Sequence, residues 1–341
     1  MDTHLEGYGT GMCDVGRGRC HVRLGLAGRV AALATAACLL VACSSDPAAE
    51  GGPEPNPGVR TRSSSPQEAA VGSASPKAQP SRDGRAGRLP AVPAQEAPAA
   101  LASQLDRAVA TLRDEDATAA ELRRAGEFQQ LAILVLAEAG SEFGGAVTSR
   151  LHRRTAAVAV PGVRAARQLR ALTDPQRLLP SWRITAPPPH QTLVDHYRDA
   201  QRRTGVPWTY LASIHLVETR MGRIRGTSTA GARGPMQFLP ATWELYGAGG
   251  DINDPRDAIL AAARLLRANG APGDMAEALW HYNPSDSYVR AVSEYAHTMQ
   301  VHDWAYRGYW QWRVLYRQTR GTFVLPVGYP DTRAVLLPGV R

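Results

Sequence analysis

Apolar side chains recur at helical spacing through most of the chain, and this pattern constrains the fold more than any other feature. The first apolar face consists of Leu101, Leu105, Ala108 and Leu112. Spacings of three and four residues place such side chains on one side of a helix. Asp254 and Pro255 form an N-cap followed by Pro at the first helical position, and Asn269 with Gly270 is a typical helix end. Sustained strand alternation comes only at residues 322–327. The chain is therefore predicted to be mainly α.

Helix-breaking residues and changes of sequence pattern divide the helical part of the chain into three regions. Residues 99–186 show helical patterns around positions 122–136 and 147–172 but no catalytic constellation, so they are predicted to be a helical accessory region. A run of three prolines at positions 187–189 ends this region. The next region, residues 187–303, contains the candidate catalytic and substrate-binding residues. Further helix caps are predicted there at Asp274 and at Ser285 or Asp286.

The last region, residues 304–341, forms an aromatic C-terminal extension. Its first half contains Trp304, Tyr306, Tyr309, Trp310, Trp312 and Tyr316. Tyr309, Trp312 and Tyr316 lie at helical spacing, which predicts that they share a helix face. Such a stripe is more typical of packing than of sugar stacking.

The N-terminus has the form of a secretory signal. Several arginines precede a short apolar run that ends at residue 42, too short to span a bilayer, which needs about 20 residues. The run ends in Leu40-Val41-Ala42-Cys43, which resembles the lipobox of bacterial lipoproteins. The resemblance implies that residues 1–42 are a lipoprotein signal peptide and that Cys43 is acylated. The protein would then be anchored by lipid to the outer face of the cytoplasmic membrane, in the cell envelope. A plain secretory signal with an incidental cysteine is the alternative.

Composition excludes several classes of function. All four cysteines lie within the first 43 residues, so the rest of the chain can form neither a disulfide nor a thiolate metal site. The formal net charge of +8 is spread without a basic block, which does not favour nucleic-acid binding. Residues 43–98 are rich in Pro, Ser, Gly and Ala, and such a segment is predicted to be a disordered tether.

Glu218 is the main candidate for a catalytic residue. It lies near the end of a helix predicted over residues 207–221, in line with Leu211 and Ile214, so its carboxylate projects from an apolar face. Desolvation and the negative end of the helix dipole both raise the pKa of such a group. A carboxylic acid that stays protonated near neutral pH can act as general acid on a glycosidic oxygen. A Glu at this position is also typical of a salt-bridged helix end.

The residues around and after Glu218 follow a specific pattern. Glu218-Thr219 is followed by Ser228, nine residues before Gln237, by the segment Gly-Pro-Met-Gln-Phe-Leu-Pro-Ala-Thr at positions 234–242, and by Tyr282-Asn283. Over about residues 190–300 this closely resembles the catalytic core of soluble lytic transglycosylases, the goose-lysozyme-like family. The resemblance implies a lysozyme-like helical catalytic domain at residues 187–303. It also implies a substrate, the MurNAc-β-1,4-GlcNAc bond of peptidoglycan glycan strands.

The resemblance also assigns roles. Glu218 would protonate the leaving oxygen and then, as a carboxylate, deprotonate the C6 hydroxyl of MurNAc, which attacks C1 and gives a 1,6-anhydro end. The residues assigned to substrate binding are Ser228, Met236, Gln237, Tyr282 and Asn283. Ser228 and Gln237 would hydrogen-bond near the N-acetyl group and the leaving sugar. Tyr282 and Asn283 would lie around the catalytic carboxyl. Met236 could equally pack in the core.

The number of acidic residues near Glu218 in the sequence bears on the mechanism. No Asp or Glu lies between Glu218 and Glu244, whereas ordinary glycosidases use two carboxylates. One acid suffices if the substrate supplies its own nucleophile. A muramidase that hydrolyses the same bond is the alternative enzyme, and a non-catalytic peptidoglycan-binding scaffold lipoprotein is the alternative without chemistry. The histidines lack companion ligands at useful spacing, so neither a metal nor a cofactor is predicted, and no protein partner is indicated.

Overall fold

The computed structural model describes residues 97–340, which form eleven helices and five short strands. The prediction of a mainly α protein is confirmed for this part. The predictions for the signal peptide, for acylated Cys43 and for the tether up to residue 96 lie outside the described residues. Pro98, the last residue assigned to the tether, is already the first residue of helix α1.

The region before the three prolines contains four helices. They are α1 (Pro98–Arg113), α2 (Ala119–Glu138), α3 (Ser141–Thr148) and α4 (Arg153–Arg170). The predicted apolar face of α1 is buried throughout. Helix α2 begins with a capping box, in which Thr118 and Glu121 satisfy each other's backbone N–H groups. The interrupted pattern at 147–172 is the end of α3 followed by α4.

Six helices follow in the next region. They are α5 (His190–Thr204), α6 (Trp208–Thr219), α7 (Pro240–Tyr246), α8 (Pro255–Ala268), α9 (Met275–Tyr282) and α10 (Asp286–Val301). The caps predicted at Asp254, Asp274 and Ser285 are confirmed, since each side chain accepts a backbone N–H of the first turn. Helix α6 ends two residues earlier than predicted, because Arg220 and Met221 are left-handed, with φ of 53° and 60°.

The C-terminal region is partly strand. It contains α11 (Ala305–Gln311) and the strands β3 (Val314–Gln318), β4 (Gly321–Leu325) and β5 (Val335–Leu336), which pair antiparallel in that order. The prediction that Tyr316 shares a helix face with Tyr309 is wrong, because Tyr316 lies in β3. Both side chains are nevertheless buried, so the interpretation of this stripe as packing is confirmed for them.

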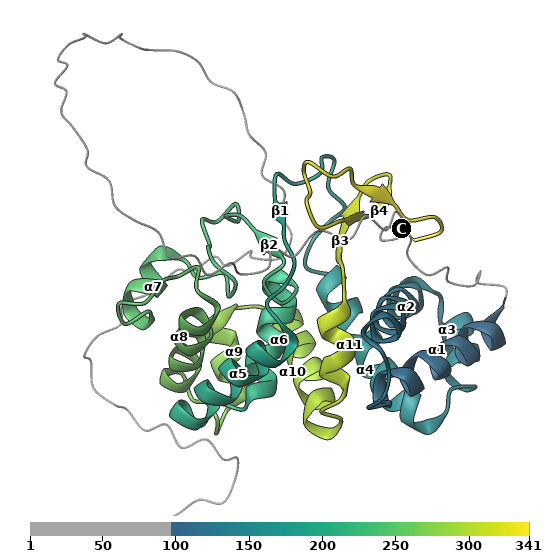
Figure 1. Ribbon diagram of the computed structural model, residues 1–341, viewed down its shortest axis with the longest axis horizontal. Coiled ribbons are helices and arrows are strands. Elements are labelled where there is room, and N and C mark those ends of the chain that lie inside the picture. The colour runs from purple at the N-terminus through teal and green to yellow at the C-terminus, as the bar shows by residue number, and fades with distance from the viewer. Residues whose placement is uncertain (1–96, 341) are drawn as a thin grey trace, which may run out of the picture. The chain divides into compact units, whose positions relative to one another are not determined.

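One hydrophobic core joins these regions. Helix α10 packs against both α4 and α6, and α11 packs against α2 (Figure 1). A smaller cluster lies around a two-stranded ribbon of β1 (Arg183–Ile184) and β2 (Ile224–Arg225). Because α10 contacts α6, a side chain on its first turn can reach the end of the helix that carries Glu218.

Candidate active site

Glu218 lies in the last turn of α6 and is almost completely buried, with 8% of its surface exposed. Tyr288, in the first turn of α10, donates a hydrogen bond of 2.8 Å from its hydroxyl to Oε1 of Glu218. The other carboxyl oxygen, Oε2, is buried and has no hydrogen-bond partner among the described residues. Burial raises the pKa of Glu218 to about 8, although the Tyr288 hydrogen bond acts in the opposite direction. At neutral pH the carboxyl is therefore mostly protonated.

The Glu218 pKa also reports on neighbouring charges. Burial and the Tyr288 hydrogen bond are the causes of its shift, and no carboxylate of residues 97–340 is among them. A pair of carboxylates that shared a site would repel each other and shift each other's pKa. The pKa of Glu218 therefore gives no sign of a second carboxylate in the described part of the chain.

Thr219 fastens the end of α6 to the loop that carries Gln237. Its Oγ1 donates a 2.6 Å hydrogen bond to the carbonyl oxygen of Pro235 and accepts one from the backbone N–H of Gly222. The loop closes on itself through paired backbone hydrogen bonds between Arg233 and Phe238. The Glu218-Thr219 pair therefore combines an acid with the anchor that fixes the loop beside it.

Gln237 is held in an unusual conformation in this loop. Its backbone is left-handed, with φ of 50°, and its side-chain amide donates to the carbonyl oxygen of Gly234 at 2.9 Å. Its side chain is half-buried. A non-glycine residue in this region costs of order 1–3 kcal/mol and persists only where the surroundings enforce it. Such strain is often found at functional sites.

Gly234 is required for this loop to close, which gives a prediction about stability. Its φ is +74°, and a Cβ added there would collide with the backbone carbonyl of Ile252. We expect Gly234→Ala to lower the free energy of unfolding by about 3 kcal/mol, measured by denaturant titration. Gly231→Ala is the matched control, since Gly231 has a φ of +84° but open space around it, and it should cost only about 1 kcal/mol. Equal losses for the two variants would contradict the steric argument.

Tyr282 connects the loop to Tyr288. Its hydroxyl donates a 2.6 Å hydrogen bond to the carbonyl oxygen of Met236, and its ring lies nearly parallel to that of Tyr288, with centroids 6.3 Å apart. The side chain of Met236 is fully buried in the core. Glu218, Tyr288, Tyr282 and the loop therefore form one contiguous arrangement, to which Met236 contributes its carbonyl oxygen.

The two remaining sequence candidates occupy turns at the edge of this arrangement. Ser228 is half-buried, and its Oγ accepts the backbone N–H of Ala232, which shapes the turn before the loop. Asn283 is buried and caps the C-terminus of α9, directly after Tyr282. Sequence reasoning missed Tyr288. Its only sequence signal is a position three residues after the predicted cap Ser285, which places it in the first turn of the helix.

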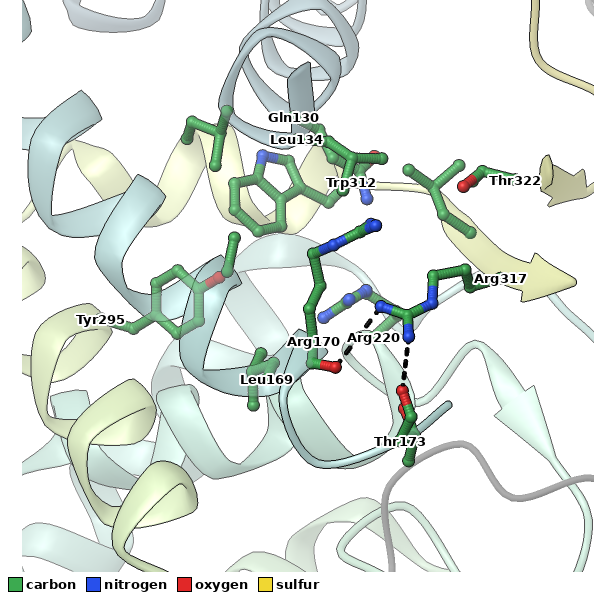
Figure 2. A pocket seen from close by; sticks show the side chains of 13 residues that line it. Gln130, Leu134, Leu169, Arg170, Thr173, Arg220, Tyr295, Trp312, Arg317 and Thr322 are labelled. Atoms are coloured by element: carbon green, nitrogen blue, oxygen red, sulfur yellow. Dashed lines mark hydrogen bonds between the residues drawn. The ribbon is translucent and has the colours of Figure 1, made fainter. Parts of the chain in front are cut away.

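A cavity of about 110 Å³ lies near the end of α6 but is distinct from this arrangement. Figure 2 shows Arg220, Trp312 and Arg317 among the residues that line it, with Arg317 donating to the carbonyl oxygens of Arg170 and Thr173. The Arg220 guanidinium donates to the carbonyl oxygen of Leu216, where the negative end of the helix favours a cation. Glu218 does not line this cavity, so it is not the candidate active site.

One histidine lies buried on the same helix as Glu218. His215 is fully buried beside the hydroxyl of Tyr197, 2.6 Å from its Nδ1, and burial lowers its pKa to about 3, so the ring is neutral. Within residues 97–340 no three His, Cys, Asp or Glu side chains are grouped as metal ligands. No helix in this part of the chain is long and apolar enough to cross a membrane.

Comparisons with protein-family models, with curated proteins and with solved structures found no match to this chain.

Proposed function

We propose that the protein is a lytic transglycosylase that cleaves the MurNAc-β-1,4-GlcNAc bond of peptidoglycan. The observation that carries the proposal is the state of Glu218: a buried carboxyl with a pKa of about 8, held at Oε1 by Tyr288, whose Oε2 has no hydrogen-bond partner within residues 97–340. A general acid works best when its pKa lies near the working pH. The sequence pattern from Glu218 to Asn283 supplies the substrate class.

In the proposed mechanism Glu218 acts twice. It first gives its proton to the leaving glycosidic oxygen, and the resulting carboxylate is stabilised by the Tyr288 hydroxyl. The carboxylate then accepts a proton from the C6 hydroxyl of MurNAc, whose oxygen attacks C1 of the same sugar. The pKa of Glu218, which gives no sign of a second carboxylate within residues 97–340, supports this intramolecular route over two-carboxylate hydrolysis.

The other residues of the pattern would position the sugar. Gln237, in its constrained loop, and Ser228 are proposed to hydrogen-bond near the N-acetyl group and the leaving sugar. Tyr282 and Asn283 are proposed to border the sugar whose C1 reacts, while Met236 keeps Tyr282 in place through its carbonyl oxygen. We propose that α5–α10 form a lysozyme-like domain around this site, since α6 presents its acid at its C-terminal end and is followed by β2, which pairs with β1 from before α5.

The test is a digestion of purified, insoluble peptidoglycan by the full chain. The proposal predicts that soluble muropeptides are released and that they end at MurNAc. Binding to the insoluble material without release of fragments would contradict it and favour the scaffold lipoprotein.

The envelope location is part of the proposal and rests on Cys43. We expect the wild-type protein to carry acyl mass on Cys43 and to fractionate with membranes, because one thioether-linked diacylglyceryl group supplies two buried chains. Cys43→Ser should move the protein to the soluble fraction, measured by fractionation and intact mass. A Cys43→Ser protein that stays with membranes, or a wild type without acyl mass, would refute the anchor.

A further inference from the structure

A second concave site lies beside the loop of the candidate active site. It is a cleft of about 530 Å³, bordered by both strands of the β1–β2 ribbon, by Arg233 with Gly234, and by Asn253. Three arginines line it, and we call it the arginine cleft: Arg183, Arg225 and Arg233. None of the described residues that line it carries a carboxylate. The charged side chains that line the cleft are therefore all positive.

The three guanidinium groups have no partner in the part of the chain that the structure describes. Among the described residues, none of them takes part in an ion pair or a side-chain hydrogen bond. An acidic residue near the cleft, Asp251, instead accepts hydrogen bonds from Asn253. The cleft thus has donors for an anion, and no acidic side chain within residues 97–340 pairs with them.

The strand register places two of these positive charges opposite each other. Arg183 and Arg225 are direct cross-strand partners in the β1–β2 ribbon. Like charges placed directly opposite each other destabilise an antiparallel pair. Elsewhere in the described residues, exposed arginines such as Arg164 and Arg203 are paired with acids. An anion bound between Arg183 and Arg225 would relieve this repulsion.

The position of the cleft relative to Glu218 suggests which anion. Strand β2 begins six residues after Glu218, and Gly234 precedes Pro235, whose carbonyl oxygen is hydrogen-bonded by Thr219. The cleft therefore borders the same loop as the candidate active site, and under the proposed function the ligands nearest to it are the substituents of a glycan strand bound at Glu218. In peptidoglycan these substituents are stem peptides with free carboxylates, and guanidinium groups bind carboxylates in bidentate fashion.

We propose that the arginine cleft binds the carboxylates of the stem peptides attached to the strand being cleaved. The inference rests on the proposed function for its substrate. Binding of these carboxylates in the arginine cleft makes the enzyme selective for peptide-bearing strands over bare glycan.

The experiment compares two substrates and three proteins. The substrates are soluble glycan strands that carry stem peptides and the same strands after an amidase has removed the peptides. The proteins are the full-length wild type, the triple variant Arg183→Gln, Arg225→Gln, Arg233→Gln, and a control triple variant. The control, Arg124→Gln, Arg153→Gln, Arg154→Gln, removes the same charge from exposed positions on α2 and α4.

The wild type and the control should cleave peptide-bearing strands with a kcat/KM about ten-fold higher than stripped strands, mostly through KM. The cleft variant should lose this preference while it cleaves stripped strands at the wild-type rate, which also shows that it is folded. A cleft variant that keeps the preference would overturn the inference and leave the proposed function intact.

If the wild type cleaves neither substrate, the proposed function fails, and calorimetric titration with free stem peptide decides the cleft separately. Binding by the wild type and the control but not by the cleft variant would uphold the site. Equal binding by all three proteins, or no binding at all, would overturn it.

Discussion

Glu218→Gln is expected to lower the rate of glycan cleavage by at least about 100-fold, the usual effect of deleting a general acid. The amide keeps the shape of the carboxyl and can still interact with Tyr288, but it has no proton to transfer. The rate is measured as release of soluble muropeptides from purified peptidoglycan. The fold and binding to the insoluble material should be retained.

The matched control for this variant is Glu244→Gln. Glu244 is the next acid in the sequence and lies exposed on α7. Its amide variant should cleave at the wild-type rate. Turnover by Glu218→Gln comparable to that of the wild type would show that another group performs the chemistry.

The same substitution is expected to stabilise the protein at alkaline pH. The ordinary pKa of Glu218 is 4.5, and burial raises it to about 8 in the folded state. The folded protein therefore holds this proton more tightly than the unfolded chain does. Its contribution to stability is fully present below pH 4.5 and is lost as the pH rises through 8. The loss amounts to about 5 kcal/mol, as expected for a pKa shift from 4.5 to about 8 at about 1.4 kcal/mol per unit.

The measurement is denaturant unfolding of the wild type and of Glu218→Gln between pH 5 and pH 9. The stability difference should move in favour of Gln as the pH rises and level off above pH 8. Because other titrating groups, such as neutral buried His215, are present in both proteins, they cancel in the difference. A difference that does not change with pH would contradict the raised pKa of Glu218.

Local signals in the sequence were sufficient to predict much of the helical fold. The caps Asp254, Asp274 and Ser285 act through hydrogen bonds within three residues, so they could be recognised from local spacing alone. Strand β3 was missed because its apolar and polar residues alternate only loosely, and this placed Tyr316 on a helix. The two-residue strands β1 and β2 are too short to produce any alternation.

The candidate site was only partly accessible from the sequence. The apolar surroundings of Glu218 follow from its own helix, so a raised pKa could be predicted. Tyr288, however, is 70 residues away and reaches Glu218 because α10 packs on α6. The role of Thr219 depends in the same way on where the chain brings Pro235. Tertiary packing determines these contacts, and local spacing does not encode it.

The most direct test of the central claim is the mass of the cleavage products formed in ¹⁸O-labelled water. With Glu218 as the single acid and the C6 hydroxyl of MurNAc as nucleophile, the product ends should be 1,6-anhydroMurNAc. They should be lighter by one water than hydrolysis products and should carry no label. Product ends that are mainly reducing MurNAc with ¹⁸O incorporated would contradict this account and assign the protein to the muramidases.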